Sequence, residues 1–245
     1  MVFNNITAQI AEPFINLHHH CDFVEINALS RGELGLDSDY LTTLYPTKDT
    51  DDLTNLFALL DARANHYDGD YPFIVDYDTK KLTLKSLLCD RKRIYIFLLL
   101  CSVNEKIVRT GNILESDFEQ ISTLILTKYL NNNSIIYHFG KSSYSDDRYV
   151  GKLTEKIDKL ASDLKCPTTY NPKHFSVQNS GDGGLDIVAW TPFPDDDNYE
   201  QIQVYLGQCA IGKDWIGKQS SISLAHWPFH YFSIIAELMK LLAIS

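Results

Sequence analysis

The sequence predicts a mixed α/β (α+β) protein, with a small mixed sheet flanked by helices and a mixed, largely helical N-terminal region. Apolar residues recur at helical spacing in several segments. Short apolar runs bounded by turn residues are typical of strands. The 245 residues are 44% hydrophobic and 12% aromatic, which is enough to bury a substantial core. A change of character near residue 110 separates an N-terminal region, 1–110, from a C-terminal domain, 111–245.

The N-terminal region combines helical and strand patterns. Four apolar residues at helical spacing predict a helix that ends at a turn cluster near residue 67. These residues are Leu53, Leu56, Phe57 and Leu60. The expected elements are a helix within 37–67, strands at 73–77 and 81–84 joined by a turn at 78–80, and a mostly buried helix at 85–103. Nothing in residues 1–110 indicates a function.

Two helices are expected early in the C-terminal domain. Residues 116–119 read Ser-Asp-Phe-Glu, a capping-box pattern that places a helix start at Ser116. This helix runs to about Leu130 and is expected to bury Phe118, Ile121, Ile125 and Tyr129. A second helix, 152–164, carries a one-sided apolar stripe formed by Leu153, Ile157, Leu160 and Leu164. The aliphatic and aromatic tail, 229–244, is expected to contain another helix.

A glycine-rich turn and two strands form the most informative segment. The turn, residues 181–184, leads into an apolar strand that begins at Asp186. A second apolar run, 202–206, is expected to end at Gly207 and Gln208. Each strand then brings a polar residue to the same edge of a small sheet. A carboxylate facing a second oxygen ligand on the next strand is how many metal-dependent nucleases hold Mg²⁺.

The sequences GDGGLDIVAW and IQVYLGQCA, in this order after a helix and a strand, resemble the core of the PD-(D/E)XK restriction-endonuclease-like superfamily. The similarity is strongest to its Mrr-like branch and covers roughly residues 116–225. It implies a restriction-endonuclease-like core and a metal-dependent endonuclease that hydrolyses DNA phosphodiester bonds. It also suggests a component of a prokaryotic anti-phage defence system.

The resemblance implies a set of ligands for Mg²⁺ (or Mn²⁺). Asp186 matches the metal-binding aspartate, and Gln208 matches the second acidic or amide position. The backbone carbonyl of Cys209 would supply a further ligand. The superfamily often adds a glutamate from the preceding helix. Helix geometry favours Glu119 over Glu155, which faces away from its buried stripe, although a capping role alone would also explain Glu119.

One residue of the family pattern is absent. The lysine expected two positions after Gln208 is replaced by Ala210. That lysine orients or deprotonates the attacking water and neutralises charge on the phosphate. Lys213 lies three residues further on and is expected to reach the same place, with Lys218 as a weaker substitute. Asp186, Gln208 and Lys213 are therefore the expected catalytic residues.

Two other functions stay open. The missing lysine and the net charge of −10 favour a catalytically inactive nuclease-fold subunit that acts in binding or complex assembly, because nucleic-acid binders usually carry a basic surface. The third possibility is a cysteine hydrolase that uses Cys209 with His226 or His230 as base. Cys209 follows an apolar strand, which favours packing as a small hydrophobe instead.

The chain gives no sign of secretion or of a membrane span. Its five cysteines contain no CxxC pair, so neither a zinc site nor a disulfide framework is expected. The longest apolar run, residues 94–101, has eight residues, against the roughly 20 that a span requires. We expect a soluble cytoplasmic protein whose partners are a DNA substrate and subunits of a defence complex, without membrane contact. Cutting both strands of a duplex would favour a homodimer.

Overall fold

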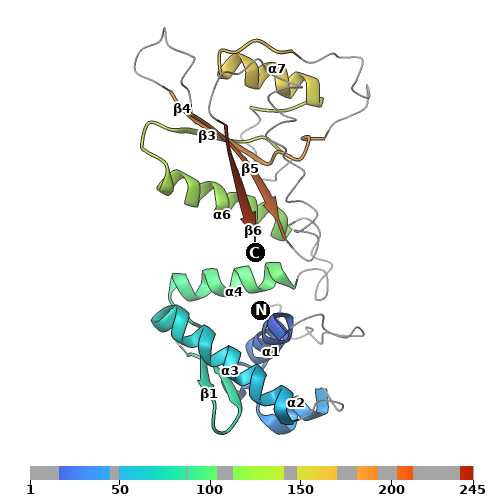
Figure 1. The fold of residues 1–245 in the computed structure, drawn as a ribbon, viewed down its shortest axis with the longest axis vertical. Helices are drawn as coiled ribbons and strands as arrows, with labels where there is room; N and C mark the ends of the chain where they lie inside the picture. The colour runs from blue at the N-terminus through green and yellow to red at the C-terminus, as the bar shows by residue number, and fades with distance from the viewer. Residues whose placement is uncertain are drawn as a thin grey trace. The chain divides into compact units, whose positions relative to one another are not determined.

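The computed structural model of the chain describes residues 17–44, 50–86, 88–103, 113–140, 148–169, 181–192, 203–211 and 238–244. The chain divides into two compact units, Met1–Arg109 and Thr110–Ser245. Each unit combines helices with a small sheet (Figure 1). The predicted α/β class is therefore confirmed.

The first unit is largely helical, as predicted. Its elements are α1 (Leu17–Arg31), η2 (Gly32–Leu34), α2 (Ser38–Leu44), α3 (Thr50–Tyr67), η3 (Asp68–Asp70), β1 (Phe73–Asp76), β2 (Lys81–Leu84) and α4 (Asp90–Ser102). The predicted hairpin is confirmed, because β1 and β2 pair antiparallel with Phe73 opposite Leu84.

The helix expected at 85–103 is shorter and more exposed than predicted. It begins at Asp90, and its buried side chains are Ile96, Leu99 and Cys101. Ile94, the first residue of the apolar run, is exposed. A uniformly apolar run carries no periodicity, so its sequence does not show which face is buried. No helix in the described part of the chain is both long and apolar enough to cross a membrane.

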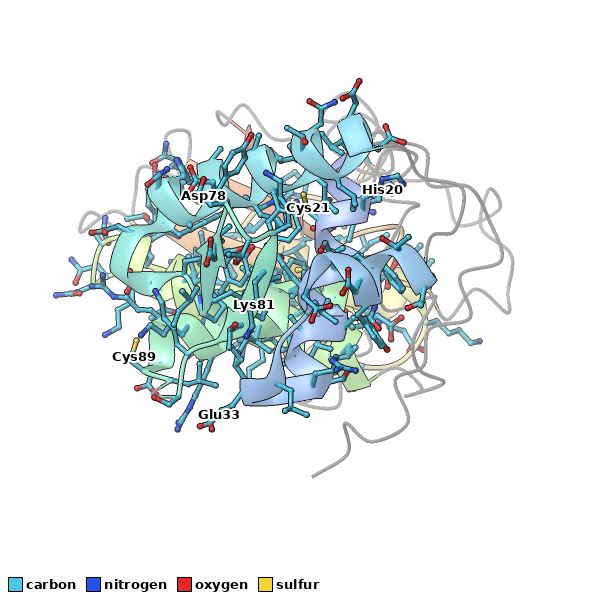
Figure 2. All side chains as sticks on the ribbon, turned by 90° about the horizontal axis from the view of Figure 1, so that it is seen from below. His20, Cys21, Glu33, Asp78, Lys81 and Cys89 are labelled. Carbon is cyan, nitrogen blue, oxygen red and sulfur yellow. The ribbon has the colours of Figure 1, made fainter. Side chains whose placement is uncertain are left out.

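Two cysteines of the first unit differ sharply in environment. Cys21 on α1 is fully buried, and its thiol lies 3.8 Å from the carbonyl oxygen of Leu56. Burial raises the pKa of this thiol to about 12. Cys89, just before α4, is exposed at the rim of the unit (Figure 2). The Cys21 thiol is therefore a packing group rather than a reactive one.

A buried carboxylate lies at the centre of the first unit. The side chain of Glu25 is 0% exposed and accepts hydrogen bonds from the hydroxyls of Tyr71 (2.6 Å) and Tyr95 (3.0 Å). Arg63 pairs with Glu25 at 3.0 Å and with Asp22 at 2.7 Å. Burial raises the pKa of Glu25, and the Arg63 guanidinium opposes this shift. We refer to these five residues as the Glu25 cluster.

The second unit has the mixed sheet flanked by helices that the sequence predicts. Its elements are α6 (Ile113–Tyr129), β3 (Ile135–His138), α7 (Leu153–Asp163), β4 (Ile187–Thr191), β5 (Gln203–Ala210) and β6 (Leu238–Ile244). The strand order is β3-β4-β5-β6. The first two pairings are antiparallel and the pairing of β5 with β6 is parallel.

The two helices of this unit pack on opposite faces of its sheet (Figure 1). The apolar stripe predicted for α7 is confirmed. It packs on the face of β4 and β5 formed by Val188, Trp190, Val204 and Leu206. Leu126 of α6, with Leu130 just beyond its end, packs on the other face against Ile187, Ala189 and Tyr205.

The start and the buried face of α6 differ from the prediction. The helix begins at Ile113, so Ser116 lies inside it and is not the cap of a capping box. Phe118 is buried as predicted and Ile121 is half-buried, but Ile125 and Tyr129 are 61% and 79% exposed. Leu126 and Leu130, four residues apart, pack on the sheet in their place.

The last two strands also correct the prediction. Strand β5 continues through Gly207 and Gln208 to Ala210 instead of ending at them. Residues 238–244 of the tail form strand β6 instead of a helix, because they pair in parallel with β5; residues 229–237, also part of the expected helical tail, lie outside the described residues. A short apolar run does not distinguish a buried helix from a buried strand without its partner.

Candidate metal centre

The glycine-rich turn positions the first candidate residue. One carboxylate oxygen of Asp182 accepts the N–H of Gly184 at 2.8 Å, and its backbone carbonyl accepts the N–H of Leu185 at 3.2 Å. Gly183 and Gly184 have φ of 66° and 82°, a region that other residues rarely adopt. The two glycines therefore allow the tight turn that leads the chain into Asp186 and β4.

Asp186 is held firmly beside β5. Its N–H donates to the carbonyl of Gly207 at 3.0 Å, and its carbonyl accepts the N–H of Phe139 at 2.7 Å. The carboxylate oxygen Oδ2 accepts the N–H of Cys209 at 2.7 Å. The backbone of the neighbouring strand thus fixes the direction of this carboxylate.

The register of β4 and β5 brings Asp186 and Gln208 together. Ile187 lies opposite Gly207, so the next pair of positions is Asp186 and Gln208. Because side chains alternate along a strand, Gln208 lies on the same face as Leu206, which is the face covered by α7. Asp186, directly before β4, and Gln208 of β5 are therefore neighbours, although the strand begins at Ile187 and not at Asp186 as expected.

Helix α6 adds two carboxylates to the same place. Glu115 and Glu119 are one helical turn apart and both line a pocket of about 310 Å³. The full lining is Glu115, Phe118, Glu119, Asp182, Gly184, Asp186, Gln208, Cys209 and Ile211. We refer to this as the acidic pocket. Glu155 does not line it; its carboxylate accepts the N–H of Lys152 at 2.8 Å, at the start of α7.

Among the described residues, some buried oxygens of the acidic pocket have no hydrogen-bond partner. Gln208 is 4% exposed, and its Oε1 has none; the same holds for Oε2 of Glu115. A buried acceptor without a partner costs about 1–3 kcal/mol. Carboxylate, amide and backbone oxygens are the ligands that hard divalent cations such as Mg²⁺ and Mn²⁺ prefer. The donor set of the pocket therefore fits the predicted cofactor.

The acidic residues line the pocket without forming a closed coordination shell. In the described ranges, no group of three His, Cys, Asp or Glu side chains is arranged to hold a metal ion. One oxygen of Asp186 is already bonded to the backbone of β5. A cation there would require the amide of Gln208 or backbone oxygens in addition to carboxylates.

Several predicted residues lie outside the described part of the chain. Lys213 and Lys218, the expected replacements for the missing lysine, are among them, as are His226 and His230. Ala210, at the position of the missing lysine, is 0% exposed and lies on the same sheet face as Gln208. Cys209 packs against the apolar cluster of α6, as a small hydrophobe would.

Two acidic residues of the pocket, Glu115 and Asp182, were not predicted. Glu115 lies four residues before Glu119, a spacing that places both on one helix face. It was missed because the helix was expected to begin at Ser116. Asp182 lies in the glycine-rich turn and was interpreted only as part of it, although an aspartate so close to Asp186 was a usable signal.

Comparison with known proteins identified no similar protein. No protein-family model, no curated protein and no solved structure matches the chain. The resemblance to the restriction-endonuclease-like superfamily therefore stays a prediction that is drawn from the residues.

Proposed function

We propose that the second unit is a metal-dependent endonuclease that hydrolyses DNA phosphodiester bonds and belongs to a prokaryotic anti-phage defence system. One observation supports the chemistry: Asp186, Gln208 and Glu119 line one pocket in which the buried Gln208 oxygen has no partner within the described ranges. The DNA substrate and the defence setting rest on the sequence resemblance alone.

The residues that would hold Mg²⁺ or Mn²⁺ are Asp186, Gln208, Glu119 and the backbone carbonyl of Cys209. Bound there, the ion would supply an activated water and charge neutralisation for the phosphate. The carboxylates of the acidic pocket would repel a phosphate on their own, so a cation is a condition for substrate approach. The Cys209 N–H holds the Asp186 carboxylate in one direction, which limits its reorganisation when ligands bind.

Cleavage of plasmid and linear DNA with Mg²⁺ or Mn²⁺ tests the proposal. We expect cleavage that EDTA stops and that Asp186→Ala reduces by about 100-fold or more, a typical loss for a group that acts on the reacting centre. Asp158→Ala, an exposed aspartate of α7 outside the pocket, is the matched control and should cleave normally. Cleavage that survives Asp186→Ala would disprove the proposal.

A second candidate function is binding or complex assembly without catalysis. The buried Ala210 favours it, because the position of the family's lysine carries no charge. This alternative predicts no cleavage with either cation, together with a stable complex with a partner protein. Co-purification of the full chain with proteins encoded beside it, combined with the cleavage assay, separates the two functions.

A further inference from the structure

Helix α7 carries a buried lysine. Lys156 of α7 is 4% exposed and belongs to the helix face that carries Leu153 and Leu160. Its ammonium donates a hydrogen bond to the carbonyl oxygen of Phe139 at 3.3 Å. Lysine is rarely buried, because removing an ammonium from water is costly unless charges compensate it.

The segment that Lys156 bonds is hydrogen-bonded to Asp186 and lies close to Asp182. The N–H groups of Phe139 and Gly140 donate to the carbonyl of Asp186 at 2.7 and 3.2 Å. A β-carbon at Gly140 would lie 3.2 Å from Asp186 Oδ1 and 3.5 Å from Asp182 Oδ2. Both carboxylates therefore come close to the backbone that Lys156 anchors.

Nearby negative charge offsets the cost of burying the Lys156 ammonium. Four carboxylates line the acidic pocket, from Glu115, Glu119, Asp182 and Asp186. Burial lowers the pKa of Lys156, and the Asp182 carboxylate opposes this shift, so the two groups act on each other electrostatically. Helix α7 also covers the sheet face of Gln208 and Ala210. Lys156 thus brings a positive charge to the side of the sheet where the expected lysine is missing.

We infer that Lys156 is a fixed positive charge close to the acidic pocket, a positioning residue that anchors the backbone around Asp186 and weakens the hold of the carboxylates on a cation. The inference rests on the proposed function. It predicts that removing the charge has opposite effects on two quantities. Cation affinity rises, because a repulsive charge is lost, whereas DNA cleavage falls.

The test uses the full chain with Lys156→Met, Lys156→Arg and Lys159→Met. Methionine keeps the length and apolar stem of lysine without its charge, and arginine keeps the charge. Lys159, on the same helix but exposed, is the matched control. Calorimetric titration with Mn²⁺ and a DNA cleavage assay are measured on each variant, with thermal unfolding to follow the fold.

We expect Lys156→Met to bind Mn²⁺ about tenfold more tightly, because one positive charge that repels the cation through solvent-screened electrostatics is removed. The same variant should cleave DNA at least about tenfold more slowly. Lys156→Arg should be closer to the wild type in Mn²⁺ affinity and in cleavage rate, and Lys159→Met should equal the wild type in both quantities.

Unchanged Mn²⁺ affinity in Lys156→Met would overturn the inference. Weaker Mn²⁺ binding together with a lowered melting temperature would also overturn it, because that result indicates that Lys156 acts through packing alone. If the wild type binds Mn²⁺ but cleaves no DNA, the proposed function fails, and the affinity change alone decides the role of Lys156. A wild type that binds no Mn²⁺ contradicts both.

Discussion

The two units each contain a group of acidic side chains, and the groups differ in how their charges are compensated. In the Glu25 cluster, a fully buried carboxylate is bonded by two tyrosine hydroxyls and paired with Arg63. In the acidic pocket, four carboxylates line an open space, and the buried oxygen of Gln208 has no partner among the described residues. Among the residues that the structure describes, the Glu25 cluster has its polar groups bonded, whereas the acidic pocket does not.

This difference separates a structural role from a binding role. Buried polar groups are nearly always hydrogen-bonded, so a complete cluster needs nothing from outside the chain. An incomplete one stores unfavourable repulsion and desolvation that a ligand can relieve. Substitutions that remove charge should therefore destabilise the first unit and stabilise the second.

The largest effect is expected in the Glu25 cluster. Arg63→Met removes the cation and leaves the buried Glu25 carboxylate uncompensated, which should lower the free energy of unfolding by about 3–5 kcal/mol. Urea denaturation followed by far-UV circular dichroism measures it. Arg91→Met is the control, because its pair with Asp70 is exposed and should contribute nothing measurable. Equal stability of the two variants would remove the contrast between the units.

A smaller effect of opposite sign is expected in the acidic pocket. Glu119→Gln removes one of four like charges at nearly constant size and should raise the free energy of unfolding by about 0.5–1 kcal/mol. The same variant should bind Mn²⁺ more weakly, since one oxygen ligand loses its charge. Glu155→Gln, at the exposed start of α7, is the control and should be slightly less stable, because an acidic side chain there favours the helix. A destabilised Glu119→Gln protein would show that this carboxylate is structural.

The sequence predicted the pairing of Asp186 with Gln208 because local signals encode it. The glycines of the turn fix where β4 begins, and the alternation of two apolar runs fixes which residues face each other. The stripe of α7 was equally clear, with four apolar residues on one face. Where hydrophobic periodicity and turn residues agree, the sequence is sufficient to predict which residues lie next to one another.

The other predictions were wrong where contacts between elements, and not local sequence, determine the structure. The pattern at Ser116 indicated a cap, but α6 begins at Ile113, so Glu115 lies on the helix and lines the pocket. The tail became β6 only because β5 offers a partner strand. Lys156 lies on the apolar stripe of α7, and a charged residue at such a position was the signal that went unused. Its relation to Asp182 and Phe139 depends on contacts between elements that the sequence does not show.

Direct titration of the full chain with Mn²⁺, followed by calorimetry, tests most directly whether the acidic pocket holds a divalent cation. The account predicts saturable binding to the wild type and to Asp158→Ala, and its loss in Asp186→Ala with the fold intact by circular dichroism. Binding of the same strength in Asp186→Ala, or no binding to the wild type, would contradict it.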